Sequence, residues 1–103
     1  MFGLSSEIMD KMVWIFNSEK KISRVKIFGS RALGRQRQGS DIDLAIEGDN
    51  LDFDTLLTLR LALEDLYLPY HFDLVPLDSS LDANLRQHID DFGVEIFFRQ
   101  RSN

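Results

Sequence analysis

A stretch of β-branched and aromatic residues that runs straight into a glycine sets the first limit on how this chain folds. Residues Ile22 to Phe28 place Val25 and Ile27 on one face, and Gly29-Ser30 follows directly. Such side chains favour strands, and glycine tolerates the sharp turn that leads from a strand into a helix. The segment therefore predicts a strand, a Gly-Ser turn and one short helical turn that ends at Gly34.

The rest of the chain alternates between helical and strand patterns. Apolar residues recur at helical spacing over residues 6–20, 52–67 and 80–92. Strand-like runs cover residues 41–46, 71–77 and 94–98. The order helix, strand, strand, helix, strand, helix, strand implies an α/β (α+β) fold with helices packed on a small mixed β-sheet. At 103 residues, we expect one domain spanning residues 1–103.

Composition excludes several classes of protein. Hydrophobic residues make up 44% of the chain and charged residues 28%, as in ordinary globular domains. No run approaches the roughly 18 apolar residues of a membrane span, and the acidic start differs from a signal peptide. The absence of cysteine excludes disulfides and cysteine-bound zinc. We therefore expect a cytoplasmic protein that does not associate with membranes.

The positive charges are concentrated in one segment. Between Lys20 and Ser40 lie seven basic residues and no acidic one, although the net charge of the chain is -5. A cationic segment in an acidic protein favours local binding of an anion over direct nucleic-acid binding, which uses a broadly basic surface. We interpret Lys20 and Lys21 as the end of the first helix. The arginines fit phosphate or partner contact and solvent exposure equally well.

Three aspartates have the spacing of a metal site. Asp41 and Asp43 are two residues apart on a predicted strand, so their side chains project from the same face. Carboxylates this close repel each other unless a cation lies between them, and hard oxygen ligands suit Mg²⁺. Asp73, on the third predicted strand, can join them if the two strands are adjacent. Such a set can hold two metal ions about 3.5–4 Å apart.

Gly29 and Ser30 have the properties of a phosphate-binding turn. Glycine lets the backbone approach an anion, and the N–H groups that open the following turn attract phosphate. The Ser30 hydroxyl adds another donor. A triphosphate held here, with its inner phosphates on metal at Asp41 and Asp43, would be set up for in-line displacement at the α-phosphorus.

The spacing of these residues resembles a known signature. Gly29-Ser30, ten residues and then Asp41-Ile42-Asp43 resemble the GS-x10-DxD pattern of the nucleotidyltransferase superfamily. The wider strings over residues 28–34, 40–44 and 71–75 resemble the MNT-type minimal nucleotidyltransferases. Those proteins are commonly the antitoxins of two-component modules with an α-helical HEPN partner. The resemblance covers essentially the whole chain and implies the nucleotidyltransferase fold.

The same resemblance implies roles for individual residues. Two Mg²⁺ ions, or Mn²⁺ in their place, would be bound by Asp41, Asp43 and Asp73. Asp73 would also be the base, or the orienting group, for the incoming hydroxyl. The nucleotide, ATP or another nucleoside triphosphate, would be bound by Gly29, Ser30 and Arg31.

One departure from the family pattern leaves several functions open. Many relatives have Ala-Arg-Gly where this chain has Ala32-Leu33-Gly34, and the loss weakens triphosphate binding unless Arg31, Arg35 or Arg37 substitutes. The first function is Mg²⁺-dependent transfer of AMP from ATP to a side-chain hydroxyl of a HEPN-type partner. The second is a non-catalytic antitoxin that neutralises the partner by contact, which Leu33 favours. The third is a small-molecule nucleotidyltransferase whose acceptor site forms between subunits.

Two further features concern metal ligands and partners. His71 and His88 match no zinc spacing and are set aside as metal ligands. Residues 94–98 have the pattern of an exposed edge strand, which pairs with another chain unless it is covered. That favours a homo- or hetero-oligomer.

Overall fold

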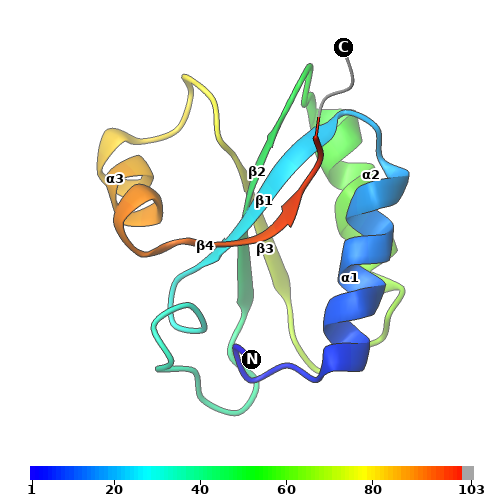
Figure 1. Ribbon diagram of the computed structural model, residues 1–103, viewed down its shortest axis with the longest axis vertical. Helices are drawn as coiled ribbons and strands as arrows, with labels where there is room; N and C mark the ends of the chain where they lie inside the picture. Colours follow the sequence, from blue (N-terminus) through cyan, green and yellow to red (C-terminus); the bar gives the residue numbers. More distant parts are fainter. Residues whose placement is uncertain (101–103) are drawn as a thin grey trace.

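Seven regular elements follow one another in the order that the sequence predicts. The computed structural model describes residues 1–100 of the chain (Figure 1). Its elements are α1 (Ser6–Ser18), β1 (Ile22–Phe28), β2 (Ile42–Gly48), α2 (Phe53–Glu64), β3 (Phe72–Pro76), α3 (Ala83–Phe92) and β4 (Val94–Phe98).

The four strands form one mixed sheet in the order β3-β2-β1-β4. β1 runs antiparallel to both β2 and β4. β2 and β3 run parallel, because α2 carries the chain back to the end at which β2 began. The sheet confirms the predicted fold class, and it leaves β4 at one edge as expected.

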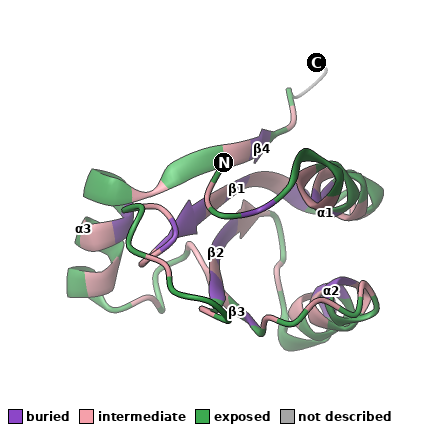
Figure 2. Ribbon diagram, turned by 90° about the horizontal axis from the view of Figure 1, so that it is seen from below, coloured by how far each residue is buried: buried purple, intermediate pink, exposed green. Residues whose placement is uncertain are grey.

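The helices lie on both faces of the sheet. α1 and α2 lie side by side on one face, and α3 lies on the other (Figure 1, Figure 2). The larger core fills the space under α1 and α2, where Phe16, Ile27, Leu44 and Leu63 are among the buried residues. The smaller core joins α3 to the sheet through Phe28, Ala45 and Ile89. The odd-numbered residues at the start of β2 therefore face the side of α3.

Side-chain caps explain where two of the helices begin. The Asp52 carboxylate accepts a hydrogen bond from the Thr55 N–H at 2.9 Å, which caps α2. The prediction placed the start of α3 near Ser80, but the helix begins at Ala83. Asp82 caps it there, because its carboxylate accepts a hydrogen bond from the Leu85 N–H at 3.0 Å. α2 ends at Glu64, short of the predicted Tyr67, whose φ of 53° is incompatible with a continuing helix.

The end of α1 differs from the expectation for its two lysines. The helix ends at Ser18, so Lys20 and Lys21 lie outside its last turn. Arg99 takes their place: its guanidinium donates hydrogen bonds to the carbonyls of Asn17 at 3.0 Å and Ile22 at 3.0 Å. A cation from the far end of the chain thus satisfies the carbonyl groups at this helix terminus. Among residues 1–100, no helix is long and apolar enough to cross a membrane.

Candidate active site

Two of the three aspartates lie next to each other on adjacent strands. Asp43 and Asp73 are register partners in the parallel pair β2–β3. Neighbouring strands are about 4.8 Å apart, and paired residues point to the same face. Ile42 and Leu44 are fully buried under α1 and α2, so Asp43 projects toward the opposite face. Asp73 shares that face and is exposed, while Asp41 is an exposed residue immediately before β2.

Gly29 leaves room for the Asp43 carboxylate. Phe28, the last residue of β1, is the register partner of Asp43, so the turn that follows β1 begins beside it. Gly29 has a φ of 72°, and a Cβ there would collide with the Asp43 carboxylate oxygen. Only glycine satisfies both conditions without strain. The expected phosphate-binding turn and the expected metal ligand are therefore in direct contact.

The chain after Gly29 makes a single hydrogen-bonded turn. The Leu33 N–H donates to the Gly29 carbonyl at 3.3 Å, and the Arg35 N–H donates to the Ser30 carbonyl at 2.8 Å. Gly34, with a φ of 70°, ends the turn where the sequence predicts. Leu33 is 39% exposed, so a longer polar side chain at this position would have access to solvent.

Asp43 carries an electrostatic penalty in the folded protein. Its pKa is raised from 3.8 to about 6, first by burial and then by the charges of Asp73 and Asp41, against a lowering by Arg31. Burial and the two neighbouring carboxylates each disfavour the negative charge, and only Arg31 opposes them. A divalent cation would relieve both the burial cost and the repulsion.

The three carboxylates fit a metal as a partial ligand set. Their hard oxygen atoms suit Mg²⁺, which normally keeps waters and takes phosphate oxygens as further ligands. Within residues 1–100, no three side chains of the His, Cys, Asp and Glu types are close enough to hold an ion by themselves. The charges of Asp73 and Asp41 nevertheless both raise the pKa of Asp43, so both act on its carboxylate. In such a site the phosphates of a nucleotide would supply further ligands.

Arg31 is not placed as the sequence suggested. It was expected among the nucleotide-binding residues, yet it is only 3% exposed and its donors are directed at protein carbonyls. Nη2 donates to the Ser40 carbonyl at 2.7 Å, and Nη1 donates to the Phe2 carbonyl at 3.0 Å. Its guanidinium also stacks on the ring of Tyr70, 4.4 Å from the centroid. Direct contact with a nucleotide stays a prediction that these contacts do not favour.

The sequence contains no signal for the partners of Arg31. Tyr70 lies 39 residues further along the chain, between α2 and β3. Arg31 donates to backbone carbonyl groups. Which residues supply them depends on the path of the chain and not on their side chains. A hollow of about 330 Å³ adjoins these residues and is lined by Gly3, Arg31, Gln36, Arg37, Gln38, Gly39, Pro69 and Tyr70.

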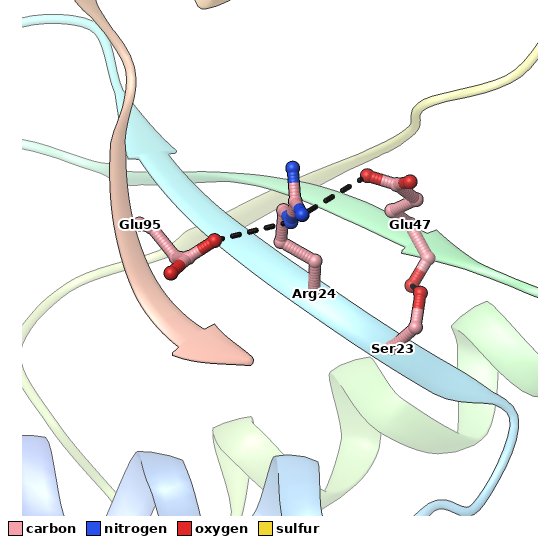
Figure 3. A network of polar contacts seen from close by, with 4 residues as sticks. All are labelled: Ser23, Arg24, Glu47 and Glu95. Carbon is pink, nitrogen blue, oxygen red and sulfur yellow. Dashed lines mark hydrogen bonds and ion pairs between the residues drawn. The ribbon is translucent and has the colours of Figure 1, made fainter. Parts of the chain in front are cut away.

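The arginines of the basic segment lie in different surroundings. Arg24 lies on the α3 side of the sheet, with Nε 3.1 Å from Glu95 Oε1 and 3.9 Å from Glu47 Oε2 (Figure 3). It therefore joins β1 to both neighbouring strands. Arg35 and Arg37 are exposed in the loop between the turn and β2, so they remain able to contact an anion.

His88, set aside as a metal ligand, packs its ring against Phe28, with the two ring centroids 6.4 Å apart.

Comparisons with known proteins identify the family and similar folds. A family model described as "Polymerase beta, Nucleotidyltransferase" matches residues 10–102. No curated protein sequence matches the chain. Among solved structures, a toxin–antitoxin with AMP-PNP is similar at a TM-score of 0.75 and 26% identity, over 89% of this chain and 74% of that chain.

Two further solved structures have the same fold. A mutant MntA toxin–antitoxin has a TM-score of 0.70 and 28% identity, over 94% of this chain and 75% of that chain. The third holds tri-AMPylated Shewanella oneidensis HEPN toxin in complex with MNT antitoxin, with a TM-score of 0.71 and 21% identity over 93% and 74%. These likenesses confirm the predicted nucleotidyltransferase fold and the resemblance to MNT antitoxins.

Proposed function

This chain belongs to the polymerase beta nucleotidyltransferase family, and on that premise we propose that it transfers AMP from ATP to a side-chain hydroxyl of a HEPN-type partner, acting as its antitoxin. One observation carries the proposal: Asp43 pairs with Asp73 on the α3 side of the sheet, and the Asp43 carboxylate lies against Gly29. Carboxylates for a metal and a turn for phosphate are thereby joined in a single site.

The solved relatives support the choice of nucleotide and partner. One of them is a toxin–antitoxin with AMP-PNP, an analogue of ATP. Another contains a HEPN toxin that is AMPylated three times and in complex with an MNT antitoxin. Both findings concern those proteins, and we extend them to this chain because the fold agrees and Asp41 and Asp43 have the spacing of the family signature.

The residues of the site divide the work of the reaction. Backbone N–H groups of the turn at Gly29 and Ser30 would bind the β- and γ-phosphates. Asp41, Asp43 and Asp73 would hold divalent ions, Mg²⁺ or Mn²⁺, which supply charge neutralisation for the triphosphate when bound. Asp73 is exposed and accessible to an acceptor, so it would take the proton of the incoming hydroxyl. The acceptor oxygen forms a bond to the α-phosphorus, and the bond to the departing pyrophosphate breaks.

A mass measurement tests the transfer. The partner protein is mixed with this chain, ATP and Mg²⁺, and we expect it to gain the mass of AMP. Asp73→Asn should abolish the gain while leaving the partner bound, since Asp73 is exposed and its substitution leaves no buried gap. Asp10→Asn, an exposed aspartate on α1, is the matched control and should modify the partner like the parent. A partner that never gains mass with the parent chain would refute catalysis.

Leu33 favours one alternative. Without an arginine at this exposed position, the chain has lost a phosphate contact that relatives are expected to use, although the aspartates are intact. The alternative is a non-catalytic antitoxin that neutralises its partner by contact. It would be supported if the parent and Asp73→Asn neutralise the partner equally and neither modifies it.

A further inference from the structure

We propose that Arg31 is a positioning residue that holds together the three segments of the chain that carry the active site. This inference rests on the proposed function, because it concerns the same site. It assigns to Arg31 no contact with the nucleotide. The argument depends on where its donors go, on its burial and on which residues follow its partners in the chain.

The guanidinium of Arg31 connects segments that are distant in sequence. Nε donates to the carbonyls of Ser40 at 3.2 Å and Asp41 at 3.3 Å, both immediately ahead of β2. Nη1 donates to the carbonyl of Phe2, in the segment that precedes α1. The plane of the guanidinium stacks on Tyr70, two residues ahead of β3. The N-terminus and the loop ahead of β2 lie at the same end of the sheet (Figure 1).

Three of the segments that meet at Arg31 lead directly to residues of the site. Arg31 follows Ser30 in the phosphate-binding turn. The carbonyl of Asp41 belongs to an expected metal ligand, and Asp43 is two residues further on. Tyr70 precedes Asp73 by three residues. A displacement of Arg31 would therefore shift the turn and all three carboxylates relative to one another.

Burial makes this connection specific to arginine. The side chain is 3% exposed, and a guanidinium stays charged in a protein, so its donors must be satisfied within the fold. Its planar fork donates in several directions while one face stacks on an aromatic ring. A lysine has a single compact ammonium and cannot reach the Phe2 and Ser40 carbonyls and cover Tyr70 at once. Arg31→Lys is therefore a test of geometry at constant charge.

A direct contact with the nucleotide is disfavoured by the same observations. The donors of Arg31 are directed at protein carbonyls, whereas Arg35 and Arg37 are exposed in the same loop. Those two arginines are better placed to meet a phosphate. Arg86→Lys is the matched control, because it makes the same chemical change at an exposed position on α3 to which no role in the site is assigned.

The experiment compares metal binding with nucleotide use. Mn²⁺ affinity is measured without nucleotide by paramagnetic resonance, and kcat and KM for ATP are measured with the partner as acceptor. We expect Arg31→Lys to weaken Mn²⁺ binding by about tenfold or more and to lower kcat, as changes behind metal ligands do. Arg86→Lys should leave Mn²⁺ binding unchanged. An Arg31→Lys protein with parental Mn²⁺ affinity and only a raised KM for ATP would overturn the proposal in favour of nucleotide contact.

A second pair of variants covers the case in which Arg31→Lys does not fold. Tyr70→Leu removes the stacking partner and should lower Mn²⁺ affinity in the same direction, by a smaller factor. Tyr70→Phe keeps the ring and should behave like the parent. Equal Mn²⁺ affinity for Tyr70→Leu and Tyr70→Phe would count against the proposal.

Hydrogen exchange separates this inference from the proposed function. Arg31→Lys should raise the exchange of backbone N–H groups over residues 36–42 and 70–73, whether or not the protein transfers AMP. If the parent transfers nothing but the exchange rises as expected, the proposed function fails and the positioning role stands. If transfer occurs in the parent and the exchange of these segments is unchanged in Arg31→Lys, the positioning role fails alone.

Discussion

Replacement of Asp43 by asparagine should stabilise the metal-free protein while it abolishes transfer. The folded-state pKa of about 6 exceeds the ordinary value of 3.8 by about two units, which corresponds to about 3 kcal/mol for a fully desolvated group. Asp43 is only half-buried, so solvent screening reduces the penalty to about 1–2 kcal/mol. Asparagine removes the charge and leaves the shape of the side chain nearly unchanged.

The sign of the effect sets its dependence on pH. Between pH 4 and 6 the folded state binds more protons at Asp43 than the unfolded state does, so this group lowers stability as the pH rises. Above about pH 6 the carboxylate is charged in the fold and the whole penalty is present. Below about pH 4 it is protonated in both states and the penalty vanishes. Asp43→Asn should therefore be more stable than the parent at pH 8 and equal to it near pH 4.

Urea unfolding in a chelator measures this difference. At pH 8 the free energy of unfolding of Asp43→Asn should exceed that of the parent by about 1–2 kcal/mol, or roughly 5–10 °C in Tm for a domain of this size. Asp10→Asn, on exposed α1 surface, should show no such gain. An Asp43→Asn protein that is less stable at pH 8, or whose advantage persists unchanged at pH 4, would refute the electrostatic account of this site.

Three other changes probe the phosphate and metal contacts. Gly29→Ala should lower the free energy of unfolding by about 1–3 kcal/mol in denaturant melts, because the φ of 72° is strained for alanine and the added Cβ meets Asp43. Gly39→Ala should cost less, because Gly39 has a φ of 80° but open space around it. Leu33→Arg should lower the Kd for ATP about tenfold in calorimetry, because an arginine at this exposed position would add a phosphate contact. An unchanged Kd would show that Leu33 is not a cause of weak ATP binding. ATP affinity in the parent should fall sharply in chelator, and equal affinity with and without Mg²⁺ would contradict a metal site.

Local pattern was sufficient for the order of the elements and for the turn at Gly29. The bounds of β1 and β4 agree with the prediction to the residue, because a glycine borders each run of β-branched and aromatic residues, Gly29 after β1 and Gly93 before β4. Gly29 was expected as a turn residue, and its positive φ confirms that. The predicted ends of the helices were less accurate. At the start of α3, for example, Asp78 lies within a few residues of the actual cap, Asp82, and is also of a residue type that caps helices.

The amino-acid sequence alone determined that this chain forms strands and helices in a nucleotidyltransferase order and that aspartates follow a Gly-Ser turn. Such features depend on residues near one another in the chain. Only the tertiary structure decided that β3 lies beside β2 with Asp73 next to Asp43. It also decided that Arg31 is buried among the carbonyls of Phe2 and Ser40. Strand neighbours and the partners of a buried charge are contacts between distant segments, and no local pattern specifies them.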